Sequence, residues 1–191
     1  LSAEQEAYLR RKGQIRMCVD PDWMPVEHIT QEGVHQGMAA DMMAKLSQML
    51  GISIVLVPAK TWQESLDLAK ARQCDILAAA LETPSRKEFM DFTTPYLSFR
   101  SVIVTNTHQV FIADFESVLG ETFGITKGYA LIEILKSRYP NIRLVEVANA
   151  LEGFNQVQEG KLFGFIDALP TIAYEFGTTT AAIQQTLSAF F

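Results

Sequence analysis

The sequence predicts an α/β protein built from two lobes, each a mostly parallel sheet flanked by helices. Strand-like runs alternate with helical patterns in the first half of the chain, and the same alternation restarts after a polar break at residues 106–108. An extended apolar segment, residues 101–105, precedes this break and is expected to cross between the lobes. We therefore assign residues 1–104 to the first lobe and residues 105–191 to the second, with a hinged cleft between them.

The composition is that of a folded protein with an acidic surface. Of the 191 residues, 48% are hydrophobic, and the net charge is −6 from 16 basic and 22 acidic side chains. The basic residues are scattered along the chain, which argues against nucleic acid as a partner. No apolar run is long enough to cross a membrane, and the first residues do not read as a signal peptide. On these features alone the chain is either cytosolic or trimmed from a longer protein.

The first lobe is expected to open with a short helix, a strand and a hairpin. Ser2 followed by Gln5 forms a capping box for the helix. The first strand covers residues 15–19, and two prolines in residues 20–25 then hold an extended loop. Residues 27–36 have the pattern of a small hairpin.

An amphipathic helix follows over residues 38–50 and ends at Gly51. Its apolar side chains recur at helical spacing and are expected to lie in the core. They are Met38, Met42, Leu46, Met49 and Leu50.

The second strand of this lobe is expected at residues 52–57. Thr61 with Glu64 forms a second capping box, which places Trp62 in the first turn of the next helix. The indole would then lie at the N-terminus of that helix.

The third strand is expected at residues 76–80, and a helix begins soon after it. Thr83 is the expected N-cap, and Pro84 suits the first helical position. Arg86 then lies on the first turn of this helix.

The second lobe repeats the alternation of strands and helices. Strands are expected at residues 122–125, 144–147 and 163–166. Helices are expected at residues 130–139, at 150–159 behind an Asn149–Glu152 capping box, and from Pro170 onward.

Five side chains are expected to meet at the carboxyl edge of the first sheet. They are Asp20, Trp23, Trp62, Thr83 and Arg86. The carboxyl ends of parallel strands form the crevice in which α/β proteins bind ligands. A guanidinium group forks onto a carboxylate and stacks on aromatic rings, so this set suits a small carboxylate held between two indoles.

The same residues also have purely structural interpretations. The tryptophans could be core aromatics, and Arg86 could pair on the surface with Glu82 or Asp91. Asp20 could cap a local turn.

The histidines and cysteines predict neither a metal site nor a disulfide. His28 and His35 could face each other across the hairpin, but the sequence offers no third ligand. Cys18 lies in the first strand and Cys74 just before the third. Both are expected to be small buried hydrophobic residues, because strand geometry rarely brings two Cβ atoms to bonding distance.

Several motifs occur in a fixed order along nearly the whole chain. They are CVDPDWMP at 18–25, GMAAD at 37–41, Trp62, TPSR at 83–86 and DFTTPY at 91–96. As an ordered set they resemble the bacterial extracellular solute-binding proteins of family 3. Residues 1–23 and 160–167 are more similar to the Venus-flytrap sensor domains of membrane histidine kinases and diguanylate cyclases than to free importer proteins.

The resemblance implies a role for each candidate side chain. Arg86 would grip the carboxylate of the ligand, Trp23 and Trp62 would sandwich its body, and Asp20 would face its polar end. Gly128 and Tyr129 match the loop that offers backbone N–H groups to an anion at the start of a helix.

The chain departs from the family pattern at three points. Leu81 stands where amino-acid binders of the family place a Ser or Thr, and Ala168 stands where they place the acid that pairs with the ligand ammonium. Asp167 is adjacent and is kept as a ligand-binding candidate, although the strand period would turn it to the other face. The chain also ends at Phe191, ahead of the strand that returns to the first lobe in the family.

The sequence therefore predicts a sensor module, the periplasmic domain of an inner-membrane protein. It would close on a small carboxylate such as an amino acid or an organic acid and signal to a membrane-anchored output domain. No cofactor, metal or catalytic residue is expected, since no nucleophile triad, phosphate loop or metal-ligand spacing occurs. Two alternatives remain: a free solute-binding subunit of an ABC amino-acid importer, and a cyclohexadienyl-dehydratase-like enzyme with Glu133 or Asp167 as the proton donor.

Overall fold

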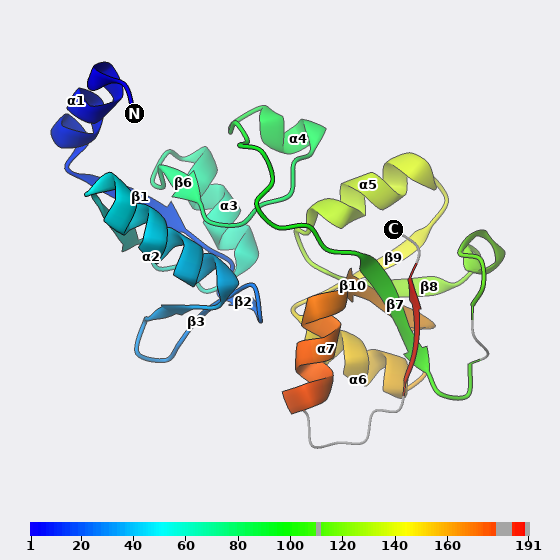
Figure 1. Ribbon diagram of the computed structural model, residues 1–191. Coiled ribbons are helices and arrows are strands. Elements are labelled where there is room, and N and C mark those ends of the chain that lie inside the picture. The colour runs from blue at the N-terminus through cyan, green and yellow to red at the C-terminus, as the bar shows by residue number, and fades with distance from the viewer. Residues whose placement is uncertain (110–111, 179–184, 190–191) are drawn as a thin grey trace. The chain divides into compact units, whose positions relative to one another are not determined.

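Residues 1–91 fold around a three-stranded parallel sheet (Figure 1). The computed structural model describes residues 1–109, 112–178 and 185–189. The chain divides into two compact units, residues 1–91 and residues 92–191. The boundary expected between residues 104 and 105 falls inside strand β7, Ser101–Asn106, which belongs to the second unit.

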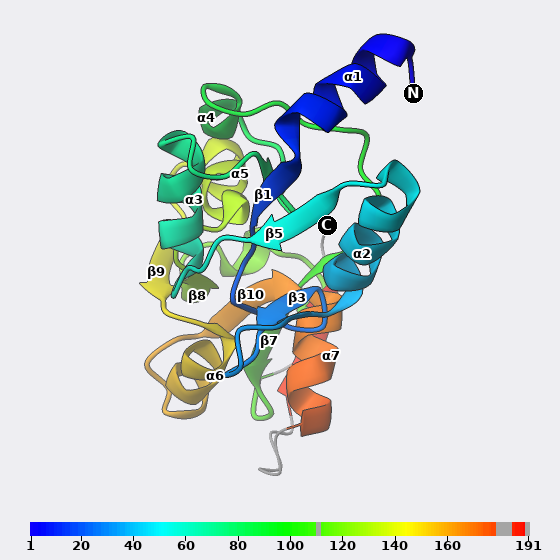
Figure 2. The same ribbon diagram turned by 90° about the vertical axis from the view of Figure 1, so that its left-hand side faces the viewer.

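The central strand of the first unit is β1, Gln14–Cys18. It pairs in parallel with β5, Ser53–Leu56, on one side and with β6, Ile76–Leu77, on the other. The helices that connect these strands are α2, Met38–Leu50, and α3, Trp62–Lys70. Because the two crossovers run in opposite directions along the sheet and both are right-handed, the helices cover opposite faces, as Figure 2 shows.

Three smaller elements that the sequence predicted complete this unit. The helix α1, Ala3–Lys12, has the capping box expected at Ser2 and Gln5. The hairpin consists of β3, Glu27–Ile29, and β4, His35–Gln36, and a short strand β2, Asp22–Trp23, adds to it. The helix α4, Pro84–Lys87, begins behind Thr83, whose hydroxyl accepts the N–H of Arg86.

The apolar face of α2 is not in the core as expected. Met42, Leu46 and Met49 are all exposed, Met49 by 72%, and Ala39 is the buried residue of this helix. The spacing predicted the helix and its end at Gly51, which adopts the left-handed conformation. The three-stranded sheet is too narrow to cover the whole stripe, so the assignment of these side chains to the core was wrong.

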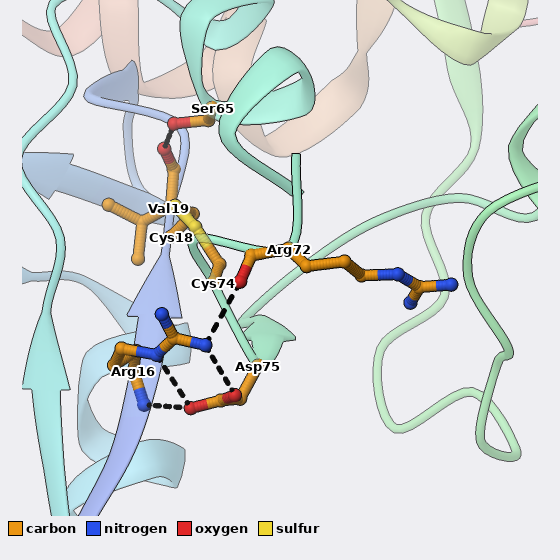
Figure 3. Close-up of a disulfide and its surroundings, with 7 residues drawn as sticks. All are labelled: Arg16, Cys18, Val19, Ser65, Arg72, Cys74 and Asp75. Atoms are coloured by element: carbon orange, nitrogen blue, oxygen red, sulfur yellow. Dashed lines mark hydrogen bonds and ion pairs between the residues drawn. A yellow bond between two sulfur atoms is a disulfide. The ribbon is translucent and has the colours of Figure 1, made fainter. Parts of the chain in front are cut away.

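Cys18 and Cys74 form a disulfide, contrary to the expectation of two separate buried thiols (Figure 3). Their Cα atoms lie 5.8 Å apart, inside the usual range for a disulfide. The sheet register alone would place Cys74 level with Ile15, because Met17 pairs with Ile76 in parallel, so the chain ahead of β6 turns to bring Cys74 to Cys18. The bond joins the end of β1 to the segment ahead of β6, and these two strands lead to the candidate residues Asp20 and Arg86.

The second unit is built on a five-stranded mixed sheet with the order β11-β7-β10-β8-β9. Its strands are β7, β8 (Thr122–Thr126), β9 (Arg143–Val147), β10 (Gly164–Ala168) and β11 (Gln185–Ala189). Its helices are α5 (Ala130–Arg138), α6 (Ala150–Gln158), α7 (Leu169–Thr178) and the short 3-10 turn Glu116–Val118. The strands β8, β9 and β10 run parallel, and β7 runs antiparallel to both of its neighbours.

Side chains on the two faces of this sheet enter two separate cores. Val104 and Phe165 pack with α6 and α7, whereas Ile103 and Ile166 pack on the other face with Leu135 of α5. Successive residues alternate between the cores because strand side chains alternate between faces. A sheet covered on both faces explains why these strands read as continuous apolar runs.

In the part of the chain that the structure describes, no helix combines the length and the apolar character needed to cross a bilayer.

Candidate functional site

Arg86 and Trp62 form the centre of the candidate site in the first unit. The guanidinium carbon of Arg86 lies 5.3 Å from the centroid of the Trp62 ring, within the range of a cation–π contact. Arg86 is only 6% exposed, and its Nη1 donates to the carbonyl oxygen of Leu81 at 2.8 Å. These contacts hold the cation within the protein. Arg86 is therefore not the exposed partner of a surface ion pair, which was the structural alternative.

The local sequence explains how these two side chains are positioned. Trp62 is the first residue of α3, directly after the N-cap Thr61, whose side chain accepts the N–H of Glu64. Thr83 caps α4 in the same way and thereby fixes the turn that carries Arg86. Both helices begin where the sequence predicted them because the capping signals are local.

Asp20 and Trp23 lie on the segment that follows β1. Asp20 is 4% exposed, and its Oδ1 accepts the N–H of Asp22 at 3.0 Å. Trp23 is half-buried in β2, where it pairs with Glu27. Asp20 thus forms the local turn considered as a structural alternative, and it is also buried at the carboxyl end of the central strand.

The five predicted side chains share one edge of the first-unit sheet. Asp20 and Trp23 follow β1, Trp62 follows β5, and Thr83 and Arg86 follow β6. Since β5 and β6 flank β1 in parallel, all three segments leave from the same edge.

The candidate residues of the second unit lie at the ends of β8 and β10. Gly128 has a positive φ of 77°, and Tyr129 is the N-cap of α5, with no capping hydrogen bond from its side chain. Asp167 on β10 is buried, and its Oδ1 accepts the N–H of Ala168 at 2.6 Å. The strands β8 and β10 are parallel neighbours, so these residues share one edge of the second sheet.

The structure shows what stands at two positions, Leu81 and Ala168, where the chain departs from the family pattern. The side chain of Leu81 is 54% exposed, and this residue contributes its carbonyl oxygen to Arg86 in place of a hydroxyl. Ala168 offers no side-chain acceptor, and the carboxylate beside it, that of Asp167, already bonds to the backbone.

Sequence reasoning missed two buried polar residues behind this edge, Glu27 and Ser65. Glu27 is 0% exposed, and its Oε1 accepts the N–H of Asp20 at 2.7 Å. Its Oε2 faces Nε2 of His35 at 3.4 Å. Burial raises the pKa of the Glu27 carboxyl, and the contacts with His35 and the Asp20 N–H oppose this rise. The position of Glu27 among apolar residues of a short hairpin was the signal that could have predicted its burial.

The expectation that His28 and His35 face each other was wrong. His28 pairs with Gln36 and His35 with Ile29, so the two rings lie on opposite faces of the hairpin. Among the described residues, no three side chains of His, Cys, Asp or Glu gather in a way that could hold a metal ion.

A family model matches residues 15–188, and its description is bacterial extracellular solute-binding proteins, family 3. Among curated proteins, the virulence sensor protein BvgS of Bordetella bronchiseptica is 21% identical over 173 residues. The match covers 91% of this chain but 14% of BvgS, so the chain spans a small part of that relative.

Two solved structures show the same fold. The periplasmic VFT2 domain of BvgS from Bordetella pertussis superposes with a TM-score of 0.85 at 20% identity, over 98% of this chain and 80% of that chain. The ancestral amino acid-binding protein AncCDT-1, a precursor of cyclohexadienyl dehydratase, gives a TM-score of 0.77 at 22% identity, over 98% of this chain and 82% of that chain. The predicted fold class, a two-lobed α/β protein of the Venus-flytrap type, is confirmed.

Proposed function

This chain belongs to family 3 of the bacterial extracellular solute-binding proteins, and we propose that it is an extracytoplasmic sensor module for a small carboxylate. In this proposal Arg86 binds the carboxylate, Trp23 and Trp62 contact the body of the ligand, and Asp20 faces its polar end. A membrane-anchored output domain receives the signal. The proposed role of this chain is ligand binding, and we assign no catalytic residue to it.

One observation carries the proposal: a buried guanidinium lies over the ring of an indole at the carboxyl edge of a parallel sheet. Ligands of α/β proteins bind at this edge. Arginine is the residue suited to carboxylates, because its planar fork donates two parallel hydrogen bonds while its face stacks on an aromatic ring. Thr83 and Leu81 fix the arginine from both sides through the bonds described above.

This chain has Ala168 where amino-acid binders of the family carry the acid for an α-ammonium group, and this departure makes acids without such a group a class to test. Ala168 provides no carboxylate for such a group, and Asp167 bonds to the backbone next to it. We therefore propose organic acids, aliphatic or aromatic, as one class to test. Amino acids are the other class, since the carboxylate of Asp20 suits an ammonium group at the polar end of the ligand.

The sensor assignment draws on the similarity to BvgS, whose name identifies a virulence sensor protein. The disulfide between Cys18 and Cys74 supports a location outside the cytoplasm, because disulfides persist in oxidising compartments. Signalling would follow from a population shift, in which the ligand favours the closed state by the contacts that it makes only there.

A thermal-shift screen tests this function. A ligand at about 100 times its dissociation constant adds ~2.7 kcal/mol to the stability of the native state. That gain corresponds to about 5–10 °C for a protein of this size. The panel should contain succinate, benzoate, L-glutamine and L-arginine, each beside an amide or ester of the same compound that lacks the carboxylate charge.

The matched variants are Arg86→Ala and Lys87→Ala. Both side chains are on α4, but Lys87 is exposed and pairs with Glu82. Arg86→Ala should remove the shift and Lys87→Ala should keep it. A shift that survives in Arg86→Ala would refute the role of the arginine.

Two other functions make different predictions. A free importer subunit predicts a gene that ends shortly after this domain, whereas the sensor predicts a gene that continues into a transmembrane helix and a kinase or cyclase. The structural likeness to a precursor of cyclohexadienyl dehydratase gives a reason to test catalysis. Release of phenylpyruvate from prephenate, measured by absorbance, would favour the enzyme over the sensor.

A further inference from the structure

The peptide unit between Val19 and Asp20 is held by side chains from two different elements. Up to Cys18 the chain takes part in sheet pairing, and the Cys18 carbonyl accepts the N–H of Ala78 at 3.1 Å. Beyond that point the Val19 carbonyl accepts from the hydroxyl of Ser65 on α3 at 2.7 Å (Figure 3). The N–H of the same peptide unit, that of Asp20, donates to Oε1 of Glu27 on β3 at 2.7 Å.

Both side chains that hold this peptide unit are completely buried. Ser65 and Glu27 are each 0% exposed. A buried backbone group needs a partner, and here each partner is a single side-chain oxygen. The carboxylate of Glu27 is itself oriented, since its second oxygen faces His35 on β4.

The geometry links these contacts to the candidate ligand residues. Asp20 begins at the held peptide, and Trp23 pairs with Glu27 across β2 and β3. Ser65 lies one helical turn after Trp62 on α3, so its hydrogen bond also ties that helix to the end of β1. The Asp20–Trp23 segment is thus fixed from the hairpin on one side and from α3 on the other.

We propose that Ser65 and Glu27 are positioning residues that clamp the Val19–Asp20 peptide and thereby set the orientation of Asp20 and Trp23 toward the ligand. Neither residue touches the ligand in this account. The importance of the clamp for binding rests on the proposed function, whereas its effect on the segment does not.

The test uses the fluorescence of Trp23 in the protein without ligand. The chain contains two tryptophans, Trp23 and Trp62, so Trp62→Phe leaves Trp23 as the single reporter. In this background Ser65→Ala removes the hydroxyl donor, and Glu27→Leu removes the acceptor at similar size. Glu27→Gln is the conservative variant, because it keeps an oxygen that accepts the Asp20 N–H.

We expect Ser65→Ala and Glu27→Leu to shift the Trp23 emission to the red and to increase its quenching by acrylamide, both measured well below the melting temperature. Glu27→Gln should restore the parent spectrum. The control is Ile52→Ala, which truncates a buried side chain of the same unit away from this segment. It should lower the melting temperature and leave the Trp23 spectrum unchanged.

The substitution Ser65→Ala is small enough to leave the protein folded. A Trp23 spectrum like that of the parent in this variant would overturn the proposal, even if the variant is less stable. In the otherwise unchanged protein, the affinity for an acid found in the screen should fall on the order of tenfold, the effect of losing one buried hydrogen-bond partner. If the spectra change but no acid in the panel binds the parent protein, the clamp stands and the proposed function fails.

Discussion

The disulfide allows one stability prediction to be worked out from the structure. Cys18 and Cys74 are 56 residues apart in the sequence. In the chain-entropy model, closing a loop of about this length lowers the entropy of the unfolded state enough to stabilise the fold by ~4 kcal/mol at 25 °C. The replacement of both cysteines by alanine should therefore cost at least about 4 kcal/mol, because the small cavity left by two buried sulfur atoms adds to the loss of the crosslink.

The corresponding loss in melting temperature depends on how the chain unfolds. With an unfolding entropy of ~2.1 cal/mol/K per residue, about 4 kcal/mol equals a loss of about 10 °C if all residues unfold together. If the first unit unfolds by itself, its smaller entropy makes the loss about 20 °C. Circular dichroism with urea and with heat measures both quantities.

Two controls separate the crosslink from the cavity that it leaves. A reductant should destabilise the parent protein by a similar amount and leave the double alanine variant unaffected. The mass of the unreduced parent should be lower by two hydrogens than that of the reduced protein. A difference below ~1 kcal/mol, or free thiols in the protein exported to an oxidising compartment, would refute the reasoning.

Two further predictions concern the hairpin of β3 and β4 and the glycine that follows it. Gly37→Ala should destabilise the protein by about 2–4 kcal/mol, because the backbone there has a φ of 109° and the added Cβ would lie 2.6 Å from the Val26 carbonyl oxygen. Gly33→Ala in the same hairpin is the control, since its φ is also positive but its Cβ would meet open space, and it should cost about 1–2 kcal/mol in urea unfolding. The raised pKa of Glu27 predicts that the free energy of unfolding declines as the pH rises from about 4.5 through the pKa of the folded state, because the folded protein binds this proton more tightly. Glu27→Gln should abolish this decline in urea titrations at a series of pH values, and an unchanged profile would contradict the assignment.

The local signals in the sequence predicted much of the fold. Ser2, Thr61, Thr83 and Asn149 all cap helices as expected, because a cap depends on only the next three residues. The two cores of the second unit follow from strands that are apolar on both faces.

The errors arose where distant contacts decide the outcome. The disulfide depends on the turn of the chain ahead of β6 that brings Cys74 to 5.8 Å from Cys18, and no spacing in the sequence predicts that turn. The exposure of Met42 depends on the width of the sheet below α2. The buried carboxylate of Glu27 faces the N–H of Asp20 and the ring of His35, and the way the hairpin folds back onto the end of β1 decides both contacts.

The shared edge of the candidate residues could be predicted from the sequence, and their role in binding stays a prediction. Trp62 and Arg86 are 24 positions apart, yet the parallel order of β5, β1 and β6 brings their segments to one edge, and the two side chains stack. The role of the Leu81 carbonyl was not predictable, because a backbone acceptor leaves no trace in the sequence.

The most direct test of the account is calorimetry with an acid from the screen and its neutral amide. The parent protein and Lys87→Ala should bind the acid and discriminate against the amide. Arg86→Ala should bind the acid on the order of 100-fold more weakly, because truncation of a buried charged partner costs ~2–5 kcal/mol. Equal affinity of the parent protein for acid and amide, or full affinity in Arg86→Ala, would contradict the claim that Arg86 recognises a carboxylate.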